Sequence, residues 1–325
     1  MLVSPTPSLE ALRWGQVFTA SRAAEREGWP PVQVIDRRRE DVGRTGLWSE
    51  ALVHALRDAA HPVCVLNRVG RSRLLACRMC GELARCEVCG SAVQQTAERQ
   101  FACHRCGAER PTVCASCGTT AFRTLRIGVT RAAEELAALL GGPVAEISAT
   151  SDLPPERDEP RAFVGTEAVL HRVRKADVVA FLDFDQELLA PRYRAADEAI
   201  ALLARAARLV GGRGGGGRVI VQTRLPEHDV LQAAVRADPD RLAQSETLTR
   251  DALGYPPFGA LAEVSGAAAD AFIEGLGRPL GLEIRGPLDG RYRVRAPDHQ
   301  VLCDALAGAP RPAGRLRVAV DPLRI

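Results

Sequence analysis

Cysteines are the residues of this sequence best suited to chemistry, because eight of the ten form four Cys-x-x-Cys pairs. A glycine follows the second cysteine of every pair. The pairs are Cys77/Cys80, Cys86/Cys89, Cys103/Cys106 and Cys114/Cys117. Two intervening residues let both thiolates reach one tetrahedral zinc ion at about 2.3 Å, and glycine accepts the positive φ of a tight turn. We therefore expect four zinc knuckles, whereas a redox motif would be a single pair opening a helix.

Eight thiolates suffice for two closed Cys₄ sites, and closed sites are structural because no coordination position remains for a substrate. Sequential and nested groupings of the pairs both satisfy four-coordination. The nested grouping is favoured because five residues separate the first two pairs and thirteen separate the second from the third, closer to a zinc-ribbon loop. It gives an inner site of Cys86, Cys89, Cys103 and Cys106, and an outer site of Cys77, Cys80, Cys114 and Cys117. We expect two zinc ions per chain.

The two remaining cysteines, Cys64 and Cys303, lack partners at ligand spacing, and we expect both to be small buried residues.

The cysteines lie in a basic stretch: between residues 66 and 131 there are eleven arginines and four acidic residues. The net charge of +3 alone would not indicate nucleic acid, but guanidinium groups fork well onto phosphates. Candidate DNA contacts are Arg68, Arg71, Arg73, Arg85, Arg105 and Arg110. A second candidate set, facing DNA or a partner, is Arg291, Arg293 and Arg295. The alternative is that these arginines form a solvated face.

Apolar periodicity predicts strands that alternate with helices, which is typical of a parallel α/β layer. Expected strands cover 62–66, 161–164, 178–183 and 218–223, and expected helices cover 9–16, 48–59, 130–140 and 195–210. Between 76 and 123 this periodicity breaks down, as expected where metal replaces an apolar core. After 255–257, strands at 260–264, 282–285, 292–296 and 316–321 and helices at 267–276 and 299–307 predict a small α+β domain.

A series of short motifs accompanies the cysteines in a fixed order. They are Ser4-Pro5-Thr6-Pro7-Ser8-Leu9-Glu10, Leu66-Asn67-Arg68-Val69-Gly70-Arg71, Val164-Gly165-Thr166, Leu182-Asp183-Phe184-Asp185, Arg194-Ala195-Ala196-Asp197, Val219-Ile220-Val221-Gln222-Thr223, Pro226-Glu227-His228, Leu253-Gly254-Tyr255-Pro256-Pro257-Phe258, Gly286-Pro287 and Val320-Asp321-Pro322. With them the sequence resembles the PriA family of primosomal replication-restart helicases over essentially its whole length. In that family the nested zinc assignment is the accepted one.

The resemblance implies a domain order for the chain. Its fold would be α/β, a RecA-like helicase lobe 2 with an inserted two-zinc ribbon module and a small C-terminal α+β domain. Residues 1–75 would be the end of a lobe 1 remnant and the start of lobe 2, and 76–125 the zinc module. Residues 126–257 would complete a degenerate lobe 2, and 258–325 would form the C-terminal domain.

The residues needed for ATP hydrolysis do not match that family. A Walker A loop needs a lysine after a glycine-rich turn, and Lys175, the only lysine, does not follow such a turn. A Walker B acid box is missing, and the arginine-finger positions of motif VI fall on Leu209 and Gly212. We therefore expect no ATPase or helicase activity, and ATP is a doubtful cofactor.

The favoured function is a replication-restart component that binds forked or single-stranded DNA and recruits replication proteins. The resemblance implies primosome proteins and single-stranded DNA-binding protein as partners. The alternatives are an active 3′–5′ DNA helicase whose N-terminal lobe is missing from this chain, and a generic zinc-ribbon interaction module. No apolar run approaches the roughly 18 residues of a membrane span, and the start has no signal peptide, so we expect a cytoplasmic protein without a membrane partner.

Overall fold

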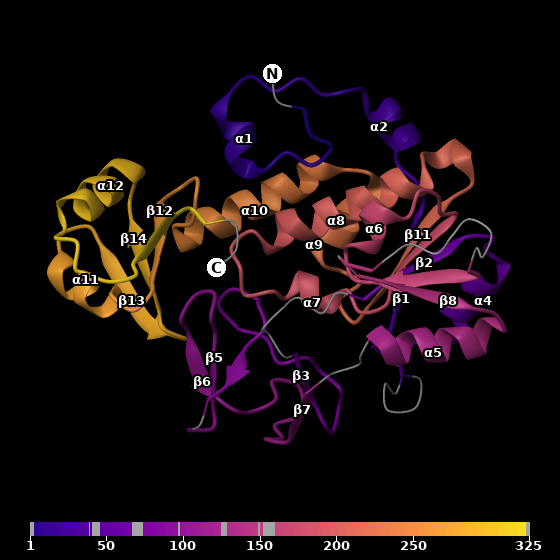
Figure 1. Ribbon diagram of the computed structural model, residues 1–325, viewed down its shortest axis with the longest axis horizontal. Helices are drawn as coiled ribbons and strands as arrows, with labels where there is room; N and C mark the ends of the chain where they lie inside the picture. The colour runs from indigo at the N-terminus through magenta and orange to yellow at the C-terminus, as the bar shows by residue number, and fades with distance from the viewer. Residues whose placement is uncertain are drawn as a thin grey trace.

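The computed structural model of the chain describes residues 3–38, 40, 46–66, 74–96, 98–124, 129–148, 150–151 and 160–322. Three sheet-containing parts are visible in Figure 1: an α/β domain, a small module of short strands below it, and a C-terminal domain beside both. An N-terminal segment carrying α1 (Leu9–Trp14) and α2 (Arg22–Gly28) crosses above the helices of the α/β domain. The candidate sites lie within the small module and where it meets its neighbours.

The α/β domain is built on a six-stranded sheet in which every pair of neighbouring strands is parallel. The strand order is β1 (Val32–Asp36), β11 (Arg218–Thr223), β10 (Val178–Phe181), β2 (Pro62–Val65), β9 (Ala162–Gly165) and β8 (Val144–Ile147). The two central strands β2 and β10 are short apolar runs buried at every position. Such runs suit a parallel sheet covered on both faces, which confirms the expected α/β class.

Helices cover the two faces of this sheet. One face packs against α4 (Glu50–Asp58) and α5 (Val129–Leu140). The other face carries α6 (Val169–Arg172), α7 (Asp185–Leu188), α8 (Ala195–Val210) and α9 (Asp229–Arg236), with α10 (Pro239–Leu253) packed on α9. A single turn of 3₁₀ helix, η2 (Arg213–Gly215), follows α8. None of the described helices is long and apolar enough to cross a membrane.

The module is inserted between β2 and α5. Strands β3 (Leu75–Cys77) and β7 (Phe122–Thr124) pair at its base, and β4 (Gln94–Gln95), β5 (Gln100–Ala102) and β6 (Glu109–Pro111) form a small antiparallel sheet. Its apolar core is centred on Phe101, which is fully buried and meets Phe122 edge-on at 4.9 Å between ring centroids. So small a core needs further cross-links, which the cysteines are placed to provide.

The C-terminal domain has a four-stranded antiparallel sheet in the order β13 (Glu283–Leu288), β14 (Arg291–Ala296), β12 (Ala260–Ser265), β15 (Arg317–Val320). Helices α11 (Ala269–Leu276) and α12 (His299–Gly308) pack on it around a core that includes Phe272 and Leu302.

One sequence expectation is wrong. Cys64 is fully buried in β2, but Cys303 is exposed, because it lies on the outward face of α12, whose buried residues are Leu302 and Leu306.

Candidate metal centres in the cysteine module

The eight paired cysteines form two groups of four. One group is the outer site, Cys77, Cys80, Cys114 and Cys117, and the other is the inner site, Cys86, Cys89, Cys103 and Cys106. Within each group all sulfur atoms lie within 4.8 Å of one another. Pairs across each site are separated by 3.5 Å (Cys77 to Cys117), 3.6 Å (Cys80 to Cys114), 3.5 Å (Cys86 to Cys106) and 3.5 Å (Cys89 to Cys103). A tetrahedral zinc ion with Zn–S bonds of about 2.3 Å separates its ligands by about 3.8 Å, so both groups fit.

The backbone of each pair repeats one turn. In the first knuckle the N–H of Gly81 donates to the carbonyl of Cys77 at 3.1 Å, and the N–H of Cys77 donates to the carbonyl of Glu82 at 2.8 Å. The four glycines have φ values of 76°, 73°, 75° and 74°, a region that glycine alone adopts without strain. The turn also directs the N–H groups of Met79 and Cys80 at the Cys77 sulfur, at 3.4 and 3.5 Å. These donors stabilise a thiolate, the form of cysteine that binds metal.

The inner site contains an additional polar group, the buried hydroxyl of Ser91. Its Oγ lies 3.2 Å from the sulfur of Cys103 and 3.3 Å from that of Cys89. The hydrogen bond with Cys89, together with the contact to Ser91, lowers the pKa of the Cys103 thiol to about 4. Sequence reasoning missed Ser91. The available signal was its position five residues after Cys86, where its carbonyl accepts the Cys86 N–H at 2.8 Å.

An all-sulfur tetrahedral set suits zinc, and four protein ligands leave no position open for a substrate. Both centres could therefore hold a structural ion that supplements the small apolar core of the module.

The six candidate DNA-contacting arginines divide into two sets. Arg68, Arg71 and Arg73 lie outside the described residues. Arg85 is exposed and forms a 3.3 Å ion pair with Glu82. Arg105 is half-buried, and its backbone carbonyl accepts hydrogen bonds from Tyr255 and Arg293.

Arg110 is turned into the module. Its guanidinium lies over the Phe101 ring, 4.8 Å from the centroid, and donates to the carbonyls of Val113 at 2.7 Å and Arg85 at 3.2 Å. These contacts give Arg110 a role in holding the module together.

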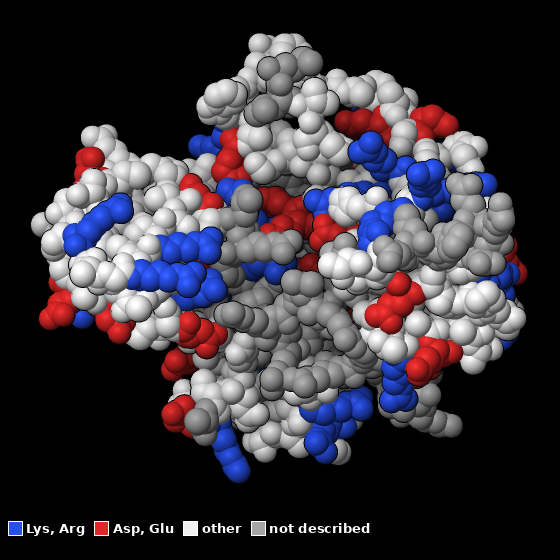
Figure 2. Space-filling view, in the orientation of Figure 1, with Lys and Arg blue, Asp and Glu red and all other residues white. Residues whose placement is uncertain are grey.

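On the face drawn in Figure 2, Lys and Arg side chains form several separate groups, over the C-terminal domain, the α/β domain and the lower end of the module.

The module is attached to the α/β domain from beside both metal sites, because Gly81 follows the outer ligand Cys80 and Ala92 follows Ser91 of the inner site. The Arg224 guanidinium donates to the carbonyl of Gly81 at 2.5 Å, and the N–H of Ala92 donates to the carbonyl of Leu189 at 2.8 Å. An apolar contact formed by Leu83, Leu189 and their neighbours completes the attachment.

Arg224 also links the outer site to buried carboxylates of the Leu182–Asp185 motif. Its backbone N–H donates to Asp185 Oδ2 at 3.0 Å, and the hydroxyl of Thr223 donates to Oδ1 of the same side chain. Burial, with a contribution from the Asp183 charge, raises the pKa of Asp185 to about 7. Two of the quoted motifs, 182–185 and 219–223, therefore meet directly behind the outer site.

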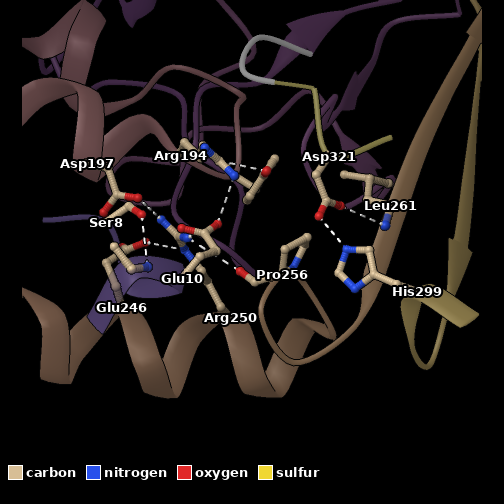
Figure 3. Close-up of polar contacts among 12 residues, drawn as sticks. Ser8, Glu10, Arg194, Asp197, Glu246, Arg250, Pro256, Leu261, His299 and Asp321 are labelled. Carbon is tan, nitrogen blue, oxygen red and sulfur yellow. Dashed lines mark hydrogen bonds and ion pairs between the residues drawn. The ribbon is translucent and has the colours of Figure 1, made fainter. Parts of the chain in front are cut away.

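A buried ionic cluster brings two other motifs together (Figure 3). Arg250 of α10 is fully buried and binds Asp197 at 2.5 Å, Glu246 at 3.1 Å and Glu10 at 3.3 Å. Arg194 binds the same Glu10 oxygen at 3.0 Å. The N-terminal segment is thereby fixed to α8 and α10.

Sequence reasoning quoted Glu10, Arg194 and Asp197 within motifs but missed Glu246 and Arg250. Their spacing of four residues on one helix was the only signal for them.

No family model matches this chain. It is 30% identical over 333 residues to a protein named "Probable replication restart protein PriA" from Mycobacterium tuberculosis (strain H37Rv), covering 96% of this chain and 49% of that protein. The corresponding protein of Mycobacterium leprae is 31% identical over 327 residues, with 94% and 48% covered. "Replication restart protein PriA" of Bacillus subtilis is 27% identical over 291 residues, with 82% and 36% covered. The chain thus spans about half the length, or less, of these relatives.

Proposed function

Because this chain is homologous to PriA replication restart proteins over most of its length, we propose that it acts in the restart of DNA replication. It would bind DNA at stalled or branched forks and recruit replication proteins, with two structural zinc ions shaping the module. The observation that carries this proposal is the combination of two closed Cys₄ groups with neighbouring motifs that meet in space. A generic zinc ribbon would not explain these motifs.

We propose that residues 1–75 and 126–257 correspond to a RecA-like lobe 2 with its preceding remnant. The support is that β1 and β2, before the module, and β8 to β11, after it, belong to one parallel sheet. The module at 76–125 is then an insertion into this domain, and 258–325 a separate C-terminal unit with its own core.

We further propose that the chain does not hydrolyse ATP. Lys175 is exposed in the segment between α6 and β10, away from any glycine-rich turn that opens a helix. At Gly212, one of the two expected arginine-finger positions, an added Cβ would lie 2.6 Å from the carbonyl oxygen of Glu27 in α2. The N-terminal segment therefore leaves no space for an arginine side chain there. An arginine finger contributes orders of magnitude to phosphoryl transfer, so its absence supports a scaffold.

The proposed partners are forked or single-stranded DNA, primosome proteins and single-stranded DNA-binding protein, in the cytoplasm. The purified chain should contain two zinc ions, bind a forked DNA in a salt-sensitive manner and show no DNA-stimulated ATP hydrolysis. DNA-stimulated turnover would contradict the scaffold function. Absence of fork binding at low salt would contradict the DNA-binding role.

The DNA contacts can be tested separately with the triple variant Arg68→Ala/Arg71→Ala/Arg73→Ala. The logarithm of the DNA-binding constant falls with the logarithm of the salt concentration, and each phosphate contact adds about 0.9 to the steepness of this fall. The triple variant should therefore show a slope that is less steep by roughly 3. Arg208→Ala, at an exposed position of α8, is the matched control and should keep the wild-type slope. An unchanged slope in the triple variant would exclude these three residues from the DNA-binding surface.

A further inference from the structure

The third knuckle, which belongs to the inner site, is bound by side chains from outside the module. Three consecutive carbonyl oxygens, those of residues 104–106, accept all of these hydrogen bonds. Arg293 of β14 donates to the carbonyl of residue 104 and, at 3.2 Å, to that of residue 105. The Tyr255 hydroxyl also donates to the carbonyl of residue 105, and Arg285 of β13 donates to that of residue 106. Two of the three donors belong to the C-terminal domain, and the other, Tyr255, lies in the segment that leads into it.

The knuckle turn itself orients these carbonyls. The N–H groups of Arg105 and Cys106 bond to the sulfur of Cys103, and the N–H of Gly107 donates to the Cys103 carbonyl at 2.9 Å. In a trans peptide the N–H and the preceding C=O point in opposite directions. Three N–H groups directed at Cys103 therefore force the three preceding carbonyls to point away from the ligand sulfurs and toward the C-terminal domain.

The fit at this contact is close on both sides. A Cβ added at Gly107 would overlap the Arg285 guanidinium, so the glycine serves the interdomain contact as well as the turn. The Tyr255 ring is buried and stacks on Tyr193, with 5.7 Å between centroids. Arg293 is half-buried, and this partial loss of water lowers its pKa, while the two knuckle carbonyls accept its hydrogen bonds. A buried guanidinium without partners is unfavourable, so docking of these strands requires the ordered knuckle.

The two metal centres are thus bound by arginines from different domains. The outer site is attached to the α/β domain through Arg224 and Gly81, and the inner site contacts the C-terminal domain through Arg285 and Arg293. Figure 1 shows the small sheet of the module lying beside the end of β13.

We propose that the inner site is a metal-dependent latch: metal bound there orders the third knuckle, and the ordered knuckle holds the C-terminal domain in its docked position. This inference rests on the zinc binding proposed above. Loss of the inner metal would release the C-terminal domain while the module stays attached to the α/β domain. Loss of the outer metal would loosen the contact of the module with Arg224 of the α/β domain, while the C-terminal domain stays docked on the third knuckle.

The test uses the full chain and two double variants. Cys89→Ser/Cys103→Ser removes inner ligands, and the control Cys80→Ser/Cys117→Ser removes outer ligands. Zinc content is measured for each protein by mass spectrometry of the metal. Each protein is then treated with hydroxyphenylglyoxal, and peptide mass spectrometry measures the rate at which each arginine is labelled.

In the inner-site variant, Arg293 should be labelled several-fold faster than in the wild type, with Arg224 unchanged; Arg285 is already exposed and is not used as a reporter. In the outer-site variant, Arg224 alone should be labelled faster. The latch would be overturned if Arg293 were labelled at the same rate in both variants, or if Arg293 and Arg224 were accelerated equally in the inner-site variant.

A variant that keeps every cysteine covers the case in which the serine variants fail to fold. Arg285→Ala/Arg293→Ala/Tyr255→Phe should retain two zinc ions but show a larger radius of gyration in solution scattering. An unchanged radius of gyration would refute the latch while leaving the zinc binding intact. A wild-type chain that binds no zinc at all would instead refute the proposed metal binding, on which the latch depends.

Discussion

Replacing Arg250 with methionine tests whether the buried ionic cluster holds the N-terminal segment on the helices of the α/β domain. Arg250 is the one member of the cluster with no exposed side-chain surface. Its three carboxylate partners, Glu10, Asp197 and Glu246, are 24%, 21% and 11% exposed. Methionine is unbranched and uncharged and is two atoms shorter than arginine, so the change removes the guanidinium and keeps the packing of the apolar stem.

The expected loss is large because the partners remain behind. Removing one member of a buried ion pair costs about 3–5 kcal/mol, since the other charge is left buried and uncompensated. A domain of this size shifts its melting temperature by about 2–4 °C per kcal/mol, so the variant should melt roughly 6–20 °C below the wild type. Arg194 still neutralises Glu10 at 3.0 Å, so the uncompensated charge is concentrated on Asp197 and Glu246.

Calorimetry and urea unfolding at neutral pH would measure the effect, with Arg241→Met as the control. Arg241 lies near the start of the same helix but is exposed, so its replacement should change stability by less than about 0.5 kcal/mol. Adding Asp197→Asn to Arg250→Met should recover part of the loss, because it removes one of the unpaired charges. A loss in Arg250→Met no greater than in Arg241→Met would refute the reasoning.

The same cluster predicts a dependence on pH. Burial raises the pKa of both Asp197 and Glu246, and Arg250 opposes this rise. Without Arg250 both pKa values should rise further. In the unfolded chain, carboxyl groups with a pKa of about 4 lose their protons above that pH, whereas Asp197 and Glu246 of the folded variant keep theirs. The stability of the variant should therefore increase as the pH falls toward about 4. The stability difference between variant and wild type should therefore narrow from about pH 8 to about pH 5.

Three further predictions follow from single sites. Cys86→Ser should release one of the two zinc ions, measured by metal analysis, and the module should then melt before the α/β domain; retention of both ions would contradict the nested grouping. The Asp185 carboxyl, with a pKa of about 7 in the folded state, stays protonated at pH values where the same carboxyl of the unfolded chain has ionised. The free energy of unfolding of the wild type should therefore decline between about pH 5 and pH 7, and Asp185→Asn should remove this decline. Phe101→Ala should destabilise the module by about 3–5 kcal/mol, seen as faster amide exchange there, because Phe101 is fully buried beneath Arg110.

The sequence was most informative where structure depends on local spacing. The Cys-x-x-Cys-Gly pattern fixes the knuckle turn within five residues, so the turns could be predicted without knowing the rest of the fold. Likewise β2 and β10 are continuous apolar runs, and their burial follows from composition. The edge strands β1 and β8 were missed because they are only half-buried and their apolar pattern is weak.

Helix α10 was missed for a different reason. Its buried residues are Leu242, Glu246 and Arg250, which recur every four residues as expected for a helix, but two of the three are charged. Apolar periodicity cannot detect a helix whose core face is an ion pair. The cluster is recognisable only when Asp197 of α8 and Glu10 of the N-terminal segment are brought beside it, and those contacts span 53 and 240 residues of sequence.

The arginines show why composition overestimates the charge available for DNA. Arg291, Arg293 and Arg295 form a strand pattern that suggested a DNA-facing or partner-facing surface, but each interacts with another part of this chain. Arg293 donates to the third knuckle, Arg295 to the carbonyl of Leu253, and Arg291 pairs with Glu263 at 2.7 Å. A guanidinium held by carbonyls or a carboxylate must lose those partners before it can bind a phosphate, which weakens the net gain. The salt dependence of the proposed DNA binding should therefore correspond to far fewer contacts than the number of arginines. Arg85 is a better candidate than the arginines of β14, because its 3.3 Å ion pair with Glu82 is exposed, and exposed ion pairs are weak.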